Sequence, residues 1–457
     1  QRALDAAIGR AAAARKAWAA HPIEARCACL AHAADLLEAR SDKLARLVTT
    51  EMGKLIGEAR AEVAKCAWVC RYYAAEAAGF LADEAVATSA ERSAVVCQPL
   101  GTVLAVMPWN FPLWQVFRAV VPALAAGNTV LLKHASNVSL CALAIADLLN
   151  EAGLPAGVFQ VLLVDSSQVH DIIADDRVHG VTFTGSVEAG RAIARAAGTH
   201  LKKCVLELGG SDAFVVLDDA EIERAADTAV TARFQNAGQS CIAAKRFIVV
   251  AAVAERFVDA LAARVRALEP GPPLDPASTL APLAKPALRD ALHAQVERSR
   301  AAGARAVVGC APLAGAGAWY QPSLLDHVQP DMAAGAEEVF GPVAAVLRVA
   351  DEDAALATAN ASRFGLGGAV WSGDSARGEA FARALECGAA CVNDMVKSDP
   401  RLPFGGIKDS GYGRELSHLG IREFVNAKSL WLALRAAPGR RQLAARQLSA
   451  RAAPSRA

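Results

Sequence analysis

The chain has 457 residues, of which 54% are hydrophobic, and its formal net charge is +1. This length exceeds one small core, so we expect two or three domains, and the near-neutral charge provides no overall field for nucleic acid or an anionic membrane. The eleven cysteines are scattered, without a Cys-x-x-Cys pair or histidines at zinc-ligand spacing. We therefore expect no metal site and a reducing, cytoplasmic setting.

The first 80 or so residues are rich in alanine and have the apolar spacing of helices. Within residues 51–73, apolar side chains recur every three or four positions, and Cys66 and Cys70 belong to this series. Cysteine behaves as a small apolar residue where it is buried, so we interpret both as core residues on one helix face.

From residue 92 to residue 107 the pattern becomes typical of β-strands, with paired valines. The most apolar run extends from about residue 99 to residue 117, close to the length of a membrane span. Pro108 and Pro112 lie within this run. Because proline interrupts a helix, we predict buried strand and loop here rather than a transmembrane helix.

Strand-like and helix-like segments then alternate along the chain. The predicted strands are 130–133, 159–164, 180–183, 205–208, 246–250 and 343–349. The predicted helices are 140–151, 169–174, 187–197, 254–268 and 288–302. This alternation indicates the α/β class, with parallel sheets covered by helices on both faces, and the two glycines at 209–210 suggest a domain boundary.

Cys241 is the strongest candidate for a reactive residue, because it ends the polar segment 236–241, Asn-Ala-Gly-Gln-Ser-Cys. A reactive thiolate needs a polar, partly accessible setting, and Gly238 permits a tight backbone there. Addition of a thiolate to an aldehyde gives a tetrahedral alkoxide that can expel hydride to a nicotinamide and leave a thioester. A lone cysteine in a polar loop is weak evidence for this chemistry unless partner groups accompany it.

Two further motifs supply those partners, a base and an amide donor. Glu207 ends an apolar strand and precedes two glycines; burial raises the pKa of such a carboxylate toward that of a general base, with a structural carboxylate as the alternative. Asn110 lies between two prolines that restrict the backbone. We predict that its amide stabilises the alkoxide together with the backbone N–H of Cys241, with a turn asparagine as the alternative.

The signal for a cofactor is weaker, because no Gly-x-Gly-x-x-Gly fingerprint follows the first predicted strand. Instead, Gly185 and Ser186 follow a predicted strand and open a predicted helix. A helix N-terminus favours a phosphate group, although glycine and serine are common in any strand-to-helix turn.

Six motifs, in this order along the chain, resemble the aldehyde dehydrogenase superfamily, and within it most the succinate-semialdehyde dehydrogenases. Besides the cysteine segment they include Pro-Trp-Asn-Phe-Pro at 108–112, Glu-Leu-Gly-Gly at 207–210 and Glu-Val-Phe-Gly-Pro at 338–342. The resemblance covers the chain from its first helices to about residue 431. It implies an aldehyde-dehydrogenase-like α/β fold with two Rossmann-type parallel-sheet domains and a small β oligomerisation extension.

The resemblance also implies a domain division, a homodimer or homotetramer, and a small-molecule aldehyde as substrate, with no nucleic acid or membrane as partner. The implied division is a dinucleotide-binding domain at 1–80 and 100–209, a catalytic domain at 210–402, an oligomerisation extension at 81–99 and 403–431, and a flexible tail at 432–457.

By the same resemblance the cofactor is NAD or NADP. The residues implied for its site are Trp109, Lys133, Ser136, Gly185, Ser186, Leu208, Glu338 and Phe340. Relatives that prefer NAD commonly have an acidic residue at the position of Ser136, where it binds the ribose hydroxyls. Without that carboxylate a 2′-phosphate is not repelled, so we expect both cofactors to work.

The resemblance to succinate-semialdehyde dehydrogenases implies three substrate-binding residues. Arg118 stands eight positions after Asn110, where those enzymes have an arginine for the distal carboxylate, and a salt-bridged surface arginine is the alternative. Gln235 replaces a second arginine that many of them have, and Ser398 belongs to a loop that contacts substrate. We therefore expect oxidation of a short ω-oxo acid, most plainly succinate semialdehyde to succinate.

Four other functions remain open at this point. The substrate could be another ω-oxo acid or a neutral aldehyde, or the thioester could pass to coenzyme A, a reaction that would not require the water-activating Glu207. A cofactor-free cysteine hydrolase and a binding protein without turnover are the alternatives from other classes.

Overall fold

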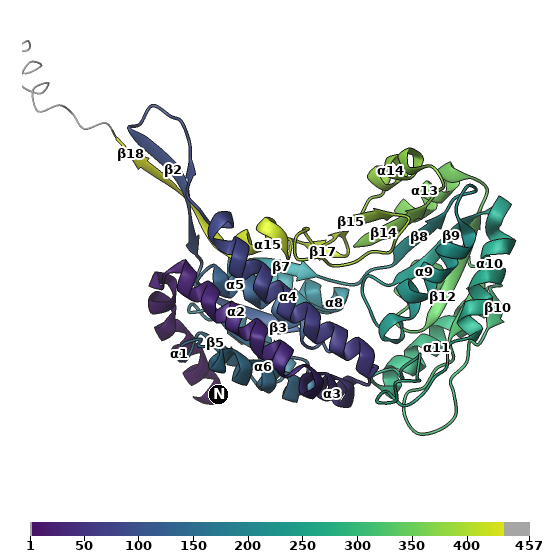
Figure 1. The fold of residues 1–457 in the computed structure, drawn as a ribbon, viewed down its shortest axis with the longest axis horizontal. Helices are drawn as coiled ribbons and strands as arrows, with labels where there is room; N and C mark the ends of the chain where they lie inside the picture. Colours follow the sequence, from purple (N-terminus) through teal and green to yellow (C-terminus); the bar gives the residue numbers. More distant parts are fainter. Residues whose placement is uncertain (1, 434–457) are drawn as a thin grey trace, which may run out of the picture.

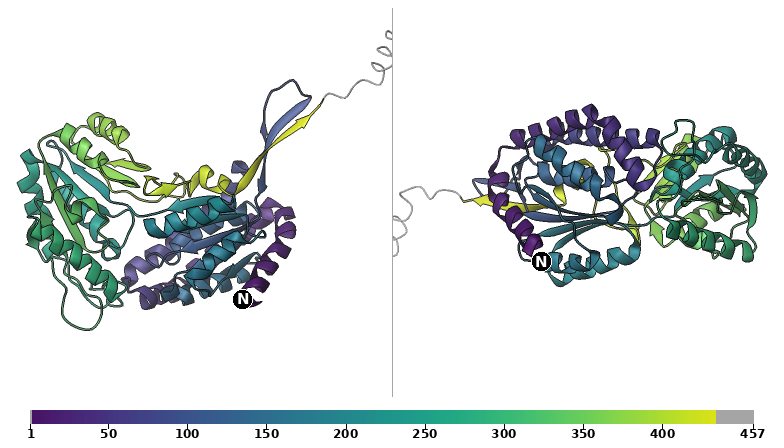
Figure 2. Two further views of the ribbon diagram at one scale, coloured as in Figure 1. Left: turned by 180° about the vertical axis from the view of Figure 1, so that it is seen from behind. Right: turned by 90° about the horizontal axis from the view of Figure 1, so that it is seen from below.

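The computed structural model describes residues 2–433, so residues 434–457 of the predicted tail lie outside the described residues. Two α/β units lie side by side, each built on its own sheet, and a narrow β-arm extends from the first unit (Figures 1 and 2). Within this described part, no helix has the length and apolar character needed to cross a membrane.

The first unit is built on a six-stranded sheet. Its strands, in sheet order, are β17 (Gly411–Tyr412), β7 (Lys203–Glu207), β6 (Gly180–Thr184), β3 (Thr102–Met107), β4 (Thr129–His134) and β5 (Phe159–Val161). Neighbouring strands are parallel except β17 and β7. The chain runs outward from β3 to β5 and then returns to β6, so the strand order reverses between β3 and β6. Ligands bind at the carboxyl ends of the strands at such a point.

Helices cover both faces of this sheet. They are α1 (Arg2–Ala20), α2 (Ile23–Ala39), α3 (Ser41–Met52), α4 (Ile56–Phe80), α5 (Trp114–Ala125), η1 (Ser136–Val138), α6 (Ser139–Glu151), η2 (Ser166–Gln168), α7 (Val169–Ala174), α8 (Val187–Thr199) and α15 (Ser417–Arg422). In β3, Ala105 and Met107 pack in a core with α2 to α6, whereas Leu104 and Val106 pack in a core with α1, α7 and α8. Successive side chains of a strand point to opposite faces, so both faces of β3 are apolar.

The second unit is built on a seven-stranded sheet. Its strands, in sheet order, are β10 (Arg305–Val308), β11 (Ser323–Asp326), β12 (Val343–Val349), β9 (Ala244–Val250), β8 (Asp212–Val216), β14 (Gly367–Trp371) and β15 (Ala389–Val392). All pairs are parallel except β10 with β11. Its helices are α9 (Ile222–Phe234), η3 (Gln235–Gly238), α10 (Ala251–Arg266), α11 (Pro286–Ala301), α12 (Ala333–Ala336), α13 (Glu352–Asn360) and α14 (Ser375–Ala384).

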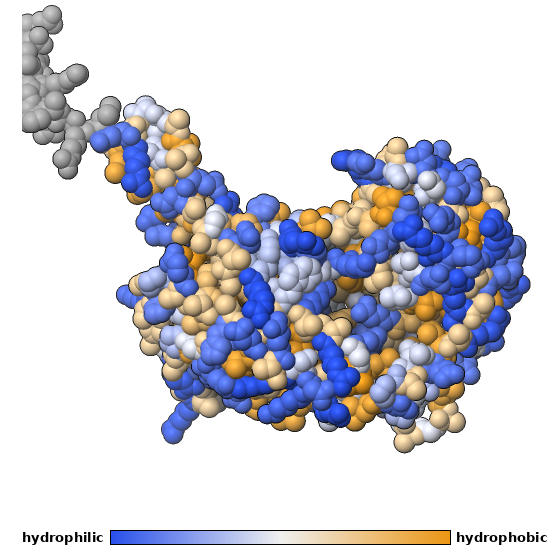
Figure 3. Space-filling view, viewed as in Figure 1, coloured by the Kyte–Doolittle hydropathy of each residue, from blue (hydrophilic) through white to orange (hydrophobic). Residues whose placement is uncertain are grey.

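The arm is a three-stranded antiparallel sheet of β1 (Glu84–Ala85), β2 (Arg92–Pro99) and β18 (Val425–Leu432). Hydrophobic residues appear along it in Figure 3, and its exposed large apolar side chains are Val86, Trp431 and Leu432. Segment 403–431 also contributes β17 to the first sheet and β16 (Ile407–Lys408), which pairs with β13 (Phe364–Gly365). This segment therefore connects the arm to both units.

The α/β class and the alternating segments predicted from the sequence are confirmed. Helix α7 and strand β12 begin and end at the predicted residues, whereas β5 ends at Val161 instead of residue 164 because it is an edge strand paired on one side only. Cys66 and Cys70 are fully buried on α4, as expected. The apolar run 99–117 is strand β3 and a loop, but its last turn already belongs to α5, which begins at Trp114.

Candidate active site

Cys241 lies in the loop between α9 and β9, and the preceding backbone is unusually constrained. Asn236, Ala237 and Gly238 have φ of 55°, 52° and 71°, in the left-handed region that non-glycine residues rarely adopt. A Cβ at Gly238 would lie 2.3 Å from the carbonyl oxygen of Gly341, so only glycine fits. The predicted tight backbone before the cysteine is thus present.

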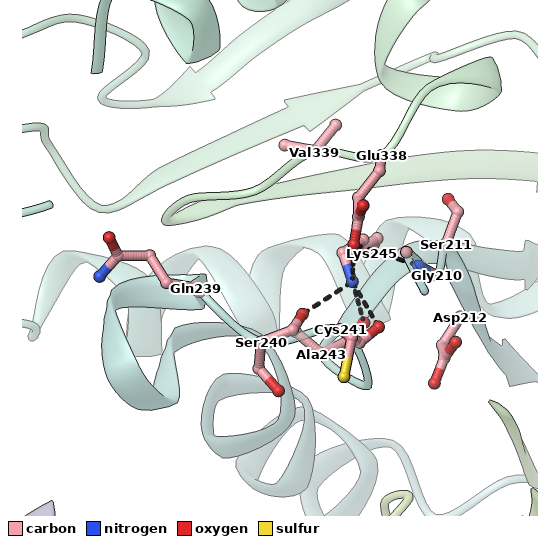
Figure 4. A network of polar contacts seen from close by, with 12 residues as sticks. Gly210, Ser211, Asp212, Gln239, Ser240, Cys241, Ala243, Lys245, Glu338 and Val339 are labelled. Atoms are coloured by element: carbon pink, nitrogen blue, oxygen red, sulfur yellow. Dashed lines mark hydrogen bonds and ion pairs between the residues drawn. The ribbon is translucent and has the colours of Figure 1, made fainter. Parts of the chain in front are cut away.

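Two buried cations hold this loop through its carbonyl groups. Figure 4 shows the ammonium of Lys245 next to the cysteine backbone, where it donates to the carbonyls of Ser240 (2.8 Å) and Cys241 (2.7 Å). It also lies 3.5 Å from a carboxylate oxygen of Glu338. The guanidinium of Arg233 donates to the carbonyl of Gly238 at 2.9 Å. Because these donors are buried and charged, they restrict the position of the loop.

Cys241 is a lining residue of two cavities. Burial raises the pKa of its thiol to about 11, and the positive charges of Arg118 and Lys245 oppose this rise. The resting group is therefore a neutral thiol at physiological pH. Its conversion to a nucleophile requires a group that accepts the proton.

One cavity, of about 330 Å³, is lined mainly by α4, α5 and the loop around residues 395–404, and we name it the charged cavity. Its charged lining residues are Glu58, Glu62, Lys65, Arg118 and Lys397. Two residues predicted to contact substrate, Gln235 and Ser398, also line it, Gln235 exposed and Ser398 buried. The structure thus brings the three predicted substrate residues to one cavity with Cys241.

Arg118 is paired within the protein. Its Nε donates to the carboxylate of Glu415, both side chains are buried, and its guanidinium lies 4.4 Å from the ring centre of Phe404. The alternative of a salt-bridged surface arginine is half right, since the salt bridge exists but is buried. The terminal nitrogens of Arg118 have no hydrogen-bond partner within residues 2–433, Nη2 is buried, and the residue lines the charged cavity.

The other cavity, of about 270 Å³, lies at the carboxyl ends of β3 and β6, and we name it the aromatic cavity. The rings of Trp109 and Phe340 meet edge to face in its wall, with centroids 5.9 Å apart. Its other lining residues are Pro108, Asn110, Gln115, Thr184, Gly185, Ser186, Leu208, Gly209, Cys241, Leu288 and Glu338.

The aromatic cavity has the features that a nicotinamide dinucleotide requires. Helix α8, of 13 residues, begins after Ser186 and directs its N-terminus toward the cavity wall, where a phosphate is favoured. The hydroxyl of Thr184 is buried there without a partner. A Cβ at Gly209 would lie 2.3 Å from the Glu338 carboxylate, so the backbone approaches that group closely. These residues fit the cofactor class predicted from the sequence.

Lys133 and Ser136 were also predicted to hold the cofactor, but they do not line the aromatic cavity. Lys133 is near the carboxyl end of β4, paired in register with Val106 of β3, and is half-buried. Ser136 is exposed at the start of η1. Both lie at the same edge of the sheet as the cavity, so their contact with a cofactor stays a prediction.

Asn110 lies close to the cysteine loop, as predicted. Its side-chain nitrogen, Nδ2, donates to the backbone carbonyl of Gln239 at 3.1 Å. The backbone carbonyl of Asn110 accepts from the side-chain nitrogen of Asn236 at 2.8 Å. The buried His134 supports the loop 108–112 that carries Asn110, because its Nε2 lies 2.8 Å from the carbonyl oxygen of Pro112. Burial lowers the pKa of His134, so this imidazole is neutral.

Glu207 is buried at the end of β7, and neither carboxylate oxygen has a hydrogen-bond partner. Burial and repulsion from Glu415 raise the pKa of Glu207 well above its ordinary value, although Arg118 opposes the rise. The carboxylate lies beside Gly405, where a Cβ would come within 2.6 Å, and it lines neither cavity. An unpaired carboxyl whose pKa is raised is a group that can act as a general base or acid.

The sequence patterns missed several lining residues. Lys65 and Glu62 of α4 line the charged cavity, Thr184 lines the aromatic one, and Gln115 of α5 lines both. Helical periodicity classified α4 as a core helix, and its polar residues carried no motif. The spacing of Glu62 and Lys65 on one face was the only available signal.

An α/β protein in which one cysteine separates a dinucleotide-type cavity from a second, charged cavity has the arrangement of an oxidoreductase that works through a cysteine adduct. The chain belongs to the aldehyde dehydrogenase family, whose model matches residues 1–430.

Its relatives include named enzymes from several bacteria. It is 52% identical over 412 residues to a probable NADP+ succinate-semialdehyde dehydrogenase of Synechocystis, covering 90% of this chain and 91% of that one. It is 47% identical over 428 residues to the NAD(P)+ succinate semialdehyde dehydrogenase of Escherichia coli, covering 94% and 93%. Among solved structures, succinic semialdehyde dehydrogenase from Streptococcus pyogenes in complex with NADP+ matches with a TM-score of 0.93 and 38% identity, covering 95% of each chain.

Proposed function

We propose that the protein oxidises succinate semialdehyde to succinate with NADP+ or NAD+, through a thioester on Cys241. The observation that carries this proposal is the position of Cys241, which lines both the charged cavity and the aromatic cavity. The named activities of relatives that are 47% and 52% identical support the substrate. The cations of the charged cavity support a substrate with a carboxylate.

In the first half of the reaction the Cys241 sulfur, as thiolate, bonds to the aldehyde carbon and gives an alkoxide. The side-chain amide of Asn110 and the backbone N–H of Cys241 donate to this oxygen; removing one such donor typically costs about 100- to 1,000-fold in rate. A nicotinamide bound in the aromatic cavity would supply the acceptor for the hydride that leaves the carbon. The carbonyl re-forms and Cys241 is left as a thioester.

The dinucleotide would be held in the aromatic cavity by Trp109, Phe340 and Leu208 along its ring, with Gly185 and Ser186 at a phosphate and Glu338 at a ribose. In the second half, water adds to the thioester carbon and the C–S bond breaks, which releases the acid and the thiolate. Glu207 accepts a proton from that water, and its raised pKa suits this role. Lys133 and Ser136 would contact the adenosine side, where the serine does not repel a 2′-phosphate.

Absorbance of the reduced nicotinamide on mixing protein, succinate semialdehyde and each dinucleotide tests the reaction, with butanal as the neutral control. The Glu207→Gln variant tests the intermediate, because it should give a single burst of reduced nicotinamide and retain an acylated Cys241 detectable by mass spectrometry. No adduct on that cysteine in the trapped variant would disprove the mechanism. Formation of an acyl-coenzyme A after addition of coenzyme A would instead identify the acylating reaction.

We further propose a homodimer or homotetramer in the cytoplasm, joined through the arm. The exposed Val86, Trp431 and Leu432 on β2–β18 and its preceding turn favour burial against another copy. All eleven cysteines are free, which suits a reducing compartment. Light scattering tests the assembly, and a stable monomer at micromolar concentration would refute it.

A further inference from the structure

Lys65 of α4 places a second cation in the charged cavity, and its surroundings differ from those of Arg118. It lines the same cavity as Cys241, and its side chain is half-buried. The ammonium donates to the hydroxyl of Ser398 at 2.7 Å and lies 4.5 Å from the ring centre of Trp114. Both contacts hold the ammonium without supplying a negative charge.

Three other buried cations near the site have a carboxylate partner, whereas Arg233 donates to backbone carbonyls. Lys54 is paired with Glu62, Arg118 with Glu415, and Lys245 lies 3.5 Å from Glu338. Within residues 2–433, Lys65 has no acidic side chain within ion-pair distance, that is, within 4.0 Å of its nitrogen. Removal of an ammonium from water is unfavourable unless an anion compensates it, so this position is suited to an anionic ligand.

Ser398 completes the same position. Its hydroxyl oxygen accepts from Lys65, and the hydroxyl hydrogen has no partner among the described contacts. A carboxylate beside the ammonium could therefore accept a hydrogen bond from the serine as well. A charged donor and a neutral donor on adjacent sites suit the two oxygens of one carboxylate.

We propose that Lys65, together with Ser398, binds the distal carboxylate of the substrate and so selects ω-oxo acids over neutral aldehydes. Arg118, whose charge is largely compensated by Glu415, lines the same cavity with terminal nitrogens that have no hydrogen-bond partner within residues 2–433. This inference rests on the proposed function, because it presupposes an acidic aldehyde in the charged cavity. It adds Lys65 beside Arg118 as a cation that determines specificity.

The test compares Lys65→Met with a matched control, Lys397→Met. Lys397 lines the same cavity, but its ammonium lies 2.8 Å from Asp394 and its side chain is exposed. For Lys65→Met we expect KM for succinate semialdehyde to rise by about 10- to 100-fold, the range for a hydrogen bond to a charged group, with kcat/KM for butanal unchanged. Lys397→Met removes a charge that is already paired with Asp394, so it should change the selectivity far less than Lys65→Met does, and Lys65→Arg should retain part of the selectivity.

A second measurement tests the binding of a carboxylic acid that the enzyme does not oxidise. Succinate should inhibit butanal oxidation by the wild type, and Lys65→Met should weaken this inhibition by a similar factor. Dinucleotide affinity, measured by quenching of tryptophan fluorescence, should not change and reports that the variant is folded.

The outcomes separate this inference from the proposed function. If the wild type oxidises butanal as efficiently as succinate semialdehyde, the proposed substrate is wrong, whatever the variants do. If the wild type prefers the acid but Lys65→Met slows both aldehydes equally, or changes selectivity no more than Lys397→Met does, the role of Lys65 is wrong and the proposed substrate stands.

Discussion

The charged cavity and the aromatic cavity share Cys241 as a lining residue but are built in different ways. The aromatic cavity lies at strand ends, and glycines such as Gly185 and Gly209 bring the backbone close to the ligand. The charged cavity is formed by long side chains of α4 and α5 and a distant loop. We therefore expect cofactor binding to depend on backbone geometry, and substrate selection to depend on side chains that single substitutions can change.

The largest effect should come from substitution of Cys241, which lines both cavities. Cys241→Ser should lower the oxidation of every aldehyde by at least about 1,000-fold, because serine has no comparable thiolate and the catalytic groups act as a unit. The affinity for dinucleotide should stay near that of the wild type. Steady-state rates and fluorescence titration measure the two quantities, and a variant that keeps a tenth of the activity would exclude covalent catalysis.

Arg118→Met should lower the stability of the protein as well as the binding of substrate in the charged cavity. It leaves the buried Glu415 without its partner, and breaking a buried ion pair typically costs about 3–5 kcal/mol. We expect a lower melting temperature and lower activity with both succinate semialdehyde and butanal. The double variant with Glu415→Gln should recover much of the stability, since the unpaired charge is removed. An unchanged melting temperature for the single variant would contradict this account.

Ser136→Glu should act on the choice of dinucleotide alone. A carboxylate there would repel the 2′-phosphate, so kcat/KM with NADP+ should fall by about 10-fold or more while that with NAD+ is maintained. Selectivity between the acid and the neutral aldehyde should not change. Ser136→Gln is the control of equal size without charge, and an equal loss with both dinucleotides would place residue 136 outside the adenosine site.

The smallest effect should appear in the pH dependence of substrate selection. Burial and the charge of Arg118 lower the pKa of Lys65 to about 8, so this ammonium is charged below that pH and neutral above it. The ratio of kcat/KM for succinate semialdehyde to that for butanal should therefore fall as the pH rises through about 8. Titration of Cys241 and Glu207 affects both aldehydes alike, so its effect cancels in this ratio. The other groups that influence Lys65 are Glu62, Cys66 and Asp399.

Matched variants sharpen this pH measurement. In Lys65→Met the ratio should be low and independent of pH, whereas Lys65→Arg should keep a higher ratio at alkaline pH because a guanidinium does not titrate there. A wild-type ratio that is constant from neutral to alkaline pH would show that another cation recognises the acid.

Local patterns predicted most of the first unit. The strands and helices between residues 129 and 207 follow the apolar spacing closely, because each is long enough to show its own period. Strand β14 was not predicted, because its segment, Gly-Gly-Ala-Val-Trp, begins with two glycines that weaken a strand in isolation. In the folded protein a Cβ at Gly367 would lie 2.5 Å from the Asp212 carboxylate, so close packing requires those glycines.

The sequence by itself determined the α/β class, through the alternation of strand-like and helix-like segments, and its short motifs predicted Cys241, Glu207 and Asn110 as nucleophile, base and amide donor. The tertiary structure decided which charges meet. Lys65 and Ser398 are 333 positions apart, and Arg118 and Glu415 are 297 apart, yet each pair is in contact. No local pattern can predict such a pairing, since the energy of a charge depends on burial and on partners that only the folded chain brings near it.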